Sequence, residues 1–169
     1  MNTINRLGLL SVLLAITITL SAQSKSYRIY DEFGHRVGFT TLAFSKAMID
    51  AVNLNIDEEN KKITGDLMEI RILIADREKT KVEGSLSKII SEKLNKSDYR
   101  KIEPSDSKQS GNVEFWIDGD SKKVKECHVI VMDSDDKQFS CLVSFYGDFR
   151  VEDLKSFEKF SRKQVHKSE

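Results

Sequence analysis

The sequence predicts an α+β domain with a mixed, mainly antiparallel sheet of about six strands and two to three packing helices. Two features of the chain carry this prediction. In the first part, segments of alternating polarity are separated by helical patterns, which implies parallel crossovers. In the later part, about four alternating segments follow one another across short turns, and such turns join antiparallel neighbours. The expected order of elements is β-α-β-α-β-β-β-β-α.

The early part of the domain is predicted as two strands, each followed by a helix. Residues 37–44 have strand character, and Ser45 offers an N-cap for a short helix. Residues 67–75 show the cleanest period of two in the chain and predict a central strand. A surface helix follows over residues 80–95. Its apolar side chains recur at steps of three and four and are Val82, Leu86, Ile89, Ile90 and Leu94.

The later part is predicted as a meander followed by a helix. Residues 99–103 form a short strand that ends before Pro104, and residues 112–118 form the next strand. Residues 124–132 and 139–145 then make a hairpin about an Asp-rich turn. The last helix is predicted from one apolar stripe, whose members are Val151, Leu154, Phe157 and Phe160.

Both cysteines lie in this hairpin. Cys127 and Cys141 fall on the same face, and we expect them within about one or two residues of direct opposition. A disulfide would need direct opposition and a strained geometry, whereas a buried free cysteine packs as a small hydrophobe. We therefore favour two free thiols and keep a Cys127–Cys141 disulfide as the alternative.

Residues 1–23 have the pattern of a secretory signal peptide. Arg6 precedes an uncharged run over residues 7–20, which is shorter than the roughly 20 apolar residues that a membrane-spanning helix needs. Small residues follow, and we place the cut after Ala22 or Gln23. The protein is therefore expected to be periplasmic or secreted, with no transmembrane segment in the mature chain.

The rest of the chain is expected to hold one domain. Residues 24–36 are polar and aromatic without a clear period, so we expect an N-terminal extension that frays. Residues 37–162 form the single α+β domain, and residues 163–169 form a polar tail. With 27 basic and 27 acidic side chains the chain is neutral, which argues against nucleic-acid binding and against adhesion to an anionic membrane.

Three stretches of the chain are similar to a known family. Residues 38–48 have the sequence GFTTLAFSKAM, residues 70–76 have IRILIAD, and the hairpin over residues 124–149 is closed by VEDL at residues 151–154. In these stretches the chain resembles the DUF4252 proteins. The resemblance implies an exported bacterial protein of unknown function, found mostly in Bacteroidetes, and supplies no catalytic residues. Many members look like lipoproteins, whereas this chain has no cysteine after the cut, so the resemblance does not extend to a lipid anchor.

Motifs that suggest catalysis or metal binding are weak. Residues 85–88 fit the S-x-x-K pattern of penicillin-recognising enzymes, but the companion motifs are absent, and these residues are expected on the surface of a helix. Aspartates cluster at two predicted turns: Asp118 and Asp120, then Asp133, Asp135 and Asp136. They suggest calcium, but an EF-hand loop would need a glycine and a glutamate that this chain lacks, and aspartate is common in turns for its local backbone bonding. We therefore expect no catalytic residue, no metal and no cofactor.

The three histidines are scattered over the chain and lack the spacing of a zinc site. They are His35, His128 and His166. We expect Glu114 to lie opposite His128 on neighbouring strands, as a structural ion pair on the outer face of the sheet.

One face of the predicted sheet is too apolar to stay in water. It lies opposite the predicted core and carries Leu73, Trp116, Ile130, Met132, Leu142 and Tyr146. Three coverings are open: a helix of the same chain, a second copy of the protein, or a ligand or partner. We treat these residues as a candidate interaction face with Trp116 as its anchor.

These observations favour an exported, non-catalytic binding or interaction module of the bacterial cell envelope. Its partner would be an envelope protein, a peptide, a small apolar ligand or a second copy. The alternative is a small periplasmic hydrolase or transferase with an unrecognised site. Such an enzyme would need a pocket with convergent polar groups.

Overall fold

The computed structural model describes residues 24–51, 66–76, 78–80, 85–103, 112–120, 122–132, 138–150, 153, 156–158 and 160–162. Some predictions fall outside these described residues. They concern the signal peptide, the polar tail, Val82, Val151, Leu154, His166 and the aspartates Asp133, Asp135 and Asp136.

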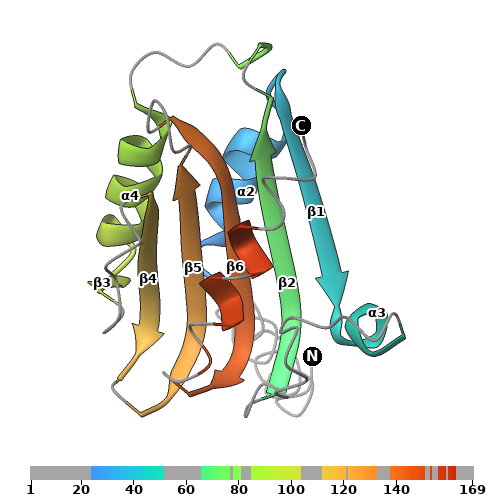
Figure 1. Ribbon diagram of the computed structural model, residues 1–169, viewed down its shortest axis with the longest axis vertical. Helices are drawn as coiled ribbons and strands as arrows, with labels where there is room; N and C mark the ends of the chain where they lie inside the picture. Colours follow the sequence, from blue (N-terminus) through green and yellow to red (C-terminus); the bar gives the residue numbers. More distant parts are fainter. Residues whose placement is uncertain are drawn as a thin grey trace, which may run out of the picture.

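The described residues form a six-stranded sheet with helices on both of its faces (Figure 1). The helices are α2 (Tyr27–Gly34), α3 (Lys46–Ala51) and α4 (Leu86–Lys96), and residues 156–158 and 160–162 near the C-terminus are also helical. The strands are β1 (Phe39–Ser45), β2 (Asp66–Ala75), β3 (Arg100–Ile102), β4 (Val113–Gly119), β5 (Val124–Met132) and β6 (Phe139–Phe149). The predicted α+β class and the predicted number of strands are confirmed.

The strand order is β1-β2-β6-β5-β4-β3, and each pair of neighbouring strands is antiparallel. The expected parallel pairing, and with it the mixed sheet, is therefore wrong. A crossover does connect β2 to β3 through α4, and these two strands run in the same direction. They are not neighbours, however, because the later strands β6, β5 and β4 insert between them and alternate in direction. The first two strands, β1 and β2, pair antiparallel although α3 lies between them in sequence.

Side chains from the two faces of the sheet enter two separate cores. The first core lies between the sheet and the C-terminal helical residues, and it includes Ile70, Ile72, Phe145, Phe157 and Phe160. The second core lies between the sheet and helices α2 and α4, and it includes Phe33, Leu73, Ile90, Trp116, Ile130 and Leu142. Burial on both faces explains why β6 is apolar along most of its length.

Helix α2 shows that the expectation of a frayed segment over residues 24–36 is wrong. Ile29, Tyr30 and Phe33 are buried against the second face of the sheet, and Ser26 lies one turn before them on the same stripe. The spacing of these four residues is that of an amphipathic helix. A helix of eight residues has little stability of its own, so packing on the sheet holds it in place.

Helices α2 and α4 also cover the face that was expected to bind a partner. Leu73, Ile130 and Leu142 have no exposed surface, and Trp116 and Tyr146 are each 7% exposed. Met132 is partly buried against the same core. Of the three coverings considered, a helix of the same chain is the one found. The six residues are therefore part of the protein interior, which corrects the expectation of an interaction face there.

The register of the hairpin separates the two cysteines. Cys127 lies opposite Phe145, and Cys141 lies opposite Val131. The cysteines are thus four positions out of opposition, or about 13 Å along the strands, which is beyond the span of a disulfide. Both are buried free thiols in the first core, as favoured. The expected near-opposition of the two cysteines is wrong because the pairing of β5 with β6 is centred on residue 136. Direct opposition of Cys127 and Cys141 would require a centre at residue 134.

Candidate functional site

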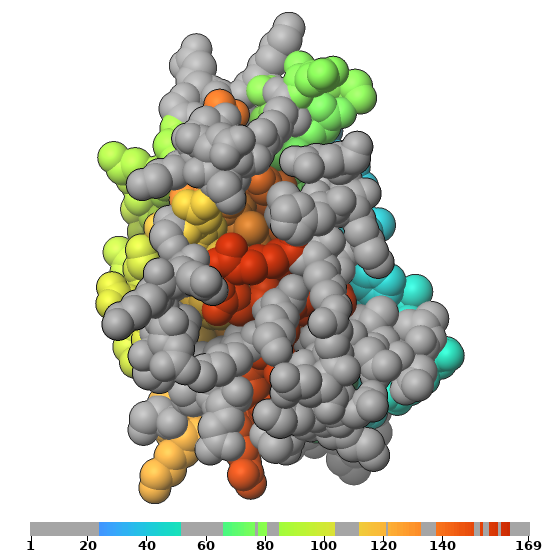
Figure 2. Space-filling view, in the orientation of Figure 1, coloured from blue at the N-terminus to red at the C-terminus, as the bar shows by residue number. Residues whose placement is uncertain are grey.

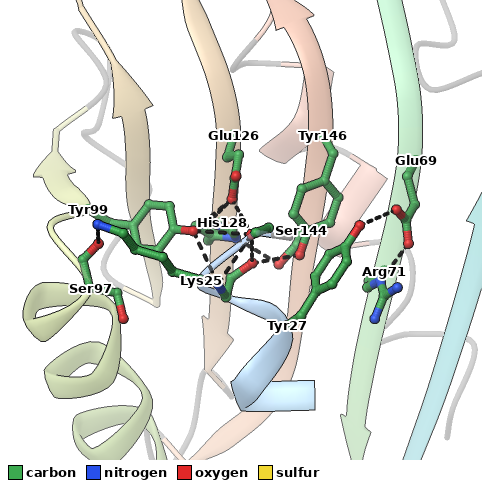
Figure 3. Close-up of polar contacts among 12 residues, drawn as sticks. Lys25, Tyr27, Glu69, Arg71, Ser97, Tyr99, Glu126, His128, Ser144 and Tyr146 are labelled. Atoms are coloured by element: carbon green, nitrogen blue, oxygen red, sulfur yellow. Dashed lines mark hydrogen bonds and ion pairs between the residues drawn. The ribbon is translucent and has the colours of Figure 1, made fainter. Parts of the chain in front are cut away.

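A cluster of polar side chains is buried between α2 and the sheet (Figure 3). We call it the polar cluster, and its members are Ser24, Ser26, Tyr30, Tyr99, Glu126, His128, Ser144 and Tyr146. The first three come from α2 and the residues before it, Tyr99 precedes β3, and the others lie on β5 and β6. Strand pairing sets the geometry, because Glu126 lies opposite Tyr146 and His128 lies opposite Ser144.

His128 is at the centre of the polar cluster and has no exposed surface. Its Nδ1 lies 2.8 Å from Ser144 Oγ, and the Tyr30 hydroxyl donates to the same Oγ at 2.6 Å. The tautomer of the imidazole sets which of Nδ1 and Ser144 Oγ donates in this contact. The other ring nitrogen, Nε2, lies 3.5 Å from Glu126 Oε2 and makes no hydrogen bond to any described residue.

Glu126 accepts hydrogen bonds instead from the segment before α2 and from the residue before β3. Ser24 Oγ donates to Oε2 at 2.6 Å, and the Tyr99 hydroxyl donates to the same oxygen at 2.7 Å. Burial acts to raise the pKa of Glu126, but the contact with His128 and the two hydroxyl donors outweigh it, so the pKa lies below its usual value. The carboxylate is therefore charged at neutral pH.

The pKa values of the other titrating groups show how dry this region is. Burial lowers the pKa of His128, and the neighbouring carboxylate of Glu126 only partly offsets that effect. Burial also raises the pKa of Tyr99 to about 12 and raises the pKa of Tyr146 and of Tyr30 still further above the ordinary value. At neutral pH, the polar cluster thus holds a neutral imidazole and neutral phenols around one carboxylate.

A second set of contacts joins α2 to β2 at the rim of the polar cluster. The Tyr27 hydroxyl donates to Glu69 Oε2 at 2.5 Å, and Arg71 Nε donates to Glu69 Oε1 at 2.5 Å. The Arg71 guanidinium carbon lies 3.6 Å from the centre of the Tyr27 ring, a cation–π contact. Burial and the Glu69 hydrogen bond raise the pKa of Tyr27 to about 12. These contacts and those of the polar cluster fasten α2 to three strands.

Ser144, His128 and Glu126 stand in the order of a nucleophile, a base and an orienting carboxylate. In a working site of this kind the nucleophile must reach a substrate. Ser144 has no exposed surface, and its hydroxyl is engaged by both Tyr30 and His128 beneath α2. In this conformation the three residues therefore stabilise the packing of α2 and cannot attack a bound molecule.

A different feature is the outer edge of β1, which pairs with no strand among the described residues and which we call the free edge. Strand β1 is the outermost strand on one side of the sheet, and with α3 it reaches the right-hand margin of the molecule in Figure 2. Its sequence FTTLAFS has no charge and no proline, and residues 40–43 are all exposed. Val37 and Met48 flank the strand and are 82% and 48% exposed. An uncharged, exposed edge of this kind is a template for adding another strand.

The backbone groups on this edge can be assigned from the strand register. The amide of Asp76 donates to the carbonyl of Gly38 at 2.7 Å, and these residues are opposite each other in the register of β1 and β2. In an antiparallel pair, residues that exchange hydrogen bonds alternate with residues that do not. Residues 40, 42 and 44 therefore bond to β2, whereas Thr41, Ala43 and Ser45 direct their amide and carbonyl groups outward.

The motifs suggested by the sequence do not come together as a site. Ser85 and Ser87 contact each other through their hydroxyls at 2.8 Å at the start of α4, while Lys88 is exposed. Asp120 accepts hydrogen bonds from the amides of Lys122 and Lys123 and so has the expected role in a turn. In the part of the chain that the structure describes, no group of three or more histidine, cysteine, aspartate or glutamate residues is placed to hold a metal ion.

The expected ion pair between Glu114 and His128 is wrong by two positions. His128 lies opposite Trp116, and Glu114 lies opposite Ile130. One position of the shift comes from a turn of four residues instead of five before Val124, and the other from a bulge between Asp118 and Gly119. Glu114 accepts instead from Ser91 Oγ at 2.8 Å and lies 3.0 Å from Lys101 Nζ. His35 is exposed at the end of α2.

The polar cluster itself was not predicted. His128 and Ser144 stand at inward positions of apolar strands, and a polar residue at such a position signals a buried hydrogen-bond partner. The partners Ser24, Ser26 and Tyr30 come from a segment that we expected to fray. Without α2, the sequence offered no donor or acceptor for these strand residues.

Comparisons with known proteins place the chain in one family. A family model described as "Domain of unknown function (DUF4252)" matches residues 30–157. No curated protein and no solved structure matches the chain. Among the described helices, none is long and apolar enough to cross a membrane.

Proposed function

The chain belongs to the DUF4252 family, and we propose that it is an exported, non-catalytic interaction module that binds an extended polypeptide strand at the free edge of β1. The observation that carries this proposal is the difference between the two edges of the sheet. Edge β3 has three residues and presents Arg100 and Lys101, which are devices that prevent strand addition. Edge β1 has seven residues and none of these devices.

The exposed apolar side chains support the same edge. Among the described residues, the large hydrophobic side chains recorded as exposed are Val37, Leu42, Met48 and Met68. Three of them lie on β1 or beside it in sequence, and Met68 lies on the neighbouring strand β2. A concentration of apolar surface at one edge favours contact with a partner there.

The absence of catalysis is part of the proposal. The constellation that favours the alternative, a small hydrolase, is Ser144, His128 and Glu126. The nucleophile would be Ser144, which is fully buried beneath α2. The hydrogen bond that its hydroxyl accepts from Tyr30 also holds α2 in place. We therefore expect the purified wild-type protein and its Ser144→Ala variant to show the same background rate of ester hydrolysis. Ester hydrolysis that disappears in a folded Ser144→Ala protein would support the alternative instead.

Export is supported by the sequence of residues 1–23, which has the pattern of a cleaved signal peptide. The predicted cut after Ala22 or Gln23 precedes Ser24, whose hydroxyl donates to Glu126. Cleavage at either bond would leave every contact of the polar cluster intact. The mature protein should therefore begin at Gln23 or Ser24 when its N-terminus is determined from the envelope or medium fraction. Recovery of a protein that still begins at Met1 would contradict export by cleavage.

The binding edge can be tested by site-specific photocrosslinking in cells that export the protein. A benzophenone amino acid replaces Thr41 on β1 in one variant and Arg100 on β3 in the control. Irradiation should give a protein adduct from position 41 and none from position 100. If position 41 gives no adduct, or if both positions react equally, β1 is not the binding edge.

A further inference from the structure

We propose that the strand added at β1 is β1 of a second copy, paired antiparallel about a two-fold axis at Leu42. This inference rests on the proposed function and names its partner. The pairing would join two six-stranded sheets into one continuous sheet with an isologous interface. Full overlap of the two seven-residue strands places Phe39 opposite Ser45 of the other copy and Leu42 opposite Leu42.

The backbone of β1 fits this arrangement. Thr41 and Ala43 direct their amide and carbonyl groups outward, as the register with β2 requires. With the axis at Leu42, Thr41 of each copy lies opposite Ala43 of the other, so the two residues can exchange both of their hydrogen bonds. The amide of Ser45 can donate to the carbonyl of Phe39, whose own amide already donates to the Arg36 carbonyl at 3.2 Å.

The side chains of β1 are complementary to themselves in the same register. Leu42 and Leu42 of the other copy form a non-hydrogen-bonded pair, the kind in which side chains approach most closely. Thr40 and Phe44 flank this pair on the same face, with Phe44 opposite Thr40. This face continues the first core, because Leu42 and Phe44 pair with Ile72 and Ile70 of β2.

Charge favours a second copy over a charged peptide. Strand β1 contains no charged residue, so a copy of itself brings no like charges into opposition and leaves no charge unpaired. A segment that ended in charged residues would find no countercharge on the strand. Edge β3 cannot serve in the same way, because pairing it with itself in full overlap would place Lys101 opposite Lys101.

The residues beside β1 extend the interface. In the same register, the start of β1 in one copy lies beside the end of β1 in the other, so Val37, before β1, comes near the end where α3 begins and Met48 lies. Val37 and Met48 are two of the most exposed large hydrophobic residues described, so the second copy would cover both ends of the strand. An interface built on one strand and its flanks is at the small end of stable interfaces, so we expect a dimer with an affinity in the micromolar range.

Sedimentation equilibrium of the purified full-length mature protein tests the dimer. The wild type should dimerise over a micromolar range of concentration. Leu42→Lys and Leu42→Glu should each weaken dimerisation at least about tenfold, because each places two like charges opposite one another. Mixing the two variants should restore association as a heterodimer. Arg100→Glu, which changes the charge of the other edge, should dimerise as the wild type does.

Circular dichroism and thermal unfolding show whether the variants are folded. Leu42 is 39% exposed, so a charged side chain there can reach water in the monomer. A monomeric wild type at high micromolar concentration would overturn the dimer. So would a folded Leu42→Lys protein that dimerises as before, or a failure of the mixture to associate.

Cysteine crosslinking tests the register independently. Leu42→Cys should form an intermolecular disulfide under mild oxidation, whereas Thr40→Cys should not, because Thr40 faces Phe44. The natural Cys127 and Cys141 are buried and do not compete. A crosslink from Thr40→Cys alone would refute the axis at Leu42.

The outcome also separates this inference from the proposed function. If the photocrosslinked adduct at Thr41 contains a different protein and the purified chain is monomeric, strand addition at β1 stands and the second copy is refuted. If position 41 forms no adduct and the chain is monomeric, both are refuted.

Discussion

His128 should make the fold less stable as the medium becomes mildly acidic. Burial lowers the pKa of its imidazole in the folded protein, whereas the unfolded chain titrates at the ordinary value near 6.5. Below about pH 7 the unfolded state therefore binds more protons than the folded state. The contribution of the neutral His128 imidazole to the free energy of unfolding is fully present above the pKa of histidine in the unfolded chain. It is lost progressively as the pH falls from that value toward the lower pKa of His128 in the folded protein.

The size of this effect follows from proton linkage. If the folded imidazole stays neutral, one histidine with an unfolded pKa of about 6.5 costs about 1.4 kcal/mol of unfolding free energy between pH 7.5 and pH 5.5. The carboxyl groups with lowered pKa values act in a different window. Glu126, Glu114 and Asp76 lose their contribution only as the pH falls below about 4.5, so they do not obscure the histidine effect.

Urea unfolding at pH 7.5, 6.5 and 5.5 measures this loss. His128→Gln keeps a polar side chain but has no titrating group, so its free energy of unfolding should change little over this range, although it is lower than that of the wild type throughout. His35→Gln is the matched control, because His35 is exposed, and it should keep the wild-type slope. A slope that persists in His128→Gln, or one that vanishes in His35→Gln, would refute the assignment to His128.

Three further predictions concern the interior. Tyr30→Phe should lower the free energy of unfolding by about 1–3 kcal/mol in urea, because Ser144 and the Arg71 carbonyl lose their donor; an unchanged value would mean that the tyrosine does not fasten α2. Gly147→Ala should cost about 2 kcal/mol or more, since Gly147 has a φ of 150° and an added Cβ would lie 2.0 Å from the Asp66 carbonyl oxygen; wild-type stability would show that β6 and β2 are less close there. Cys127 and Cys141 should both resist a thiol reagent in the native protein and react after denaturation, because burial raises the pKa of Cys141 to about 12 and that of Cys127 further; loss of both thiols in the non-reduced denatured protein would indicate a disulfide.

The strands and helix α4 could be predicted because their apolar side chains recur regularly along the sequence. They recur every second residue in the strands and every three or four residues over more than two turns in α4. Strand β5 has the predicted bounds, and β2 differs from its prediction by one residue. Strand order could not be predicted in this way. Strand β2 has one apolar face and carries Glu69, Arg71 and Leu73 on the other, and its local sequence does not determine that β6 rather than β3 is its neighbour.

Positions across strands were harder to predict than the strands themselves. Bulges near Gly119 and Met132 shift the register, and a small shift displaces each cross-strand pair. The expected contact of Glu114 with His128 failed because of the bulge near Gly119 and a turn one residue shorter than expected. The polar cluster could not be predicted because it depends on α2. The two turns of α2 are too short for their period to be recognised, since Ser26 and two tyrosines stand among the apolar positions.

The exposed apolar character of β1 is not explained by folding alone. Most residues of β5 and β6 are apolar because helices cover both faces of those strands, but residues 40–43 of β1 are exposed and contribute little to either core. Lysine or threonine at Leu42 would cost the monomer little and would protect the edge, as Arg100 and Lys101 do at β3. The uncharged edge is thus better explained by association than by stability, and a sheet covered on both faces leaves its edges as the places where association can occur.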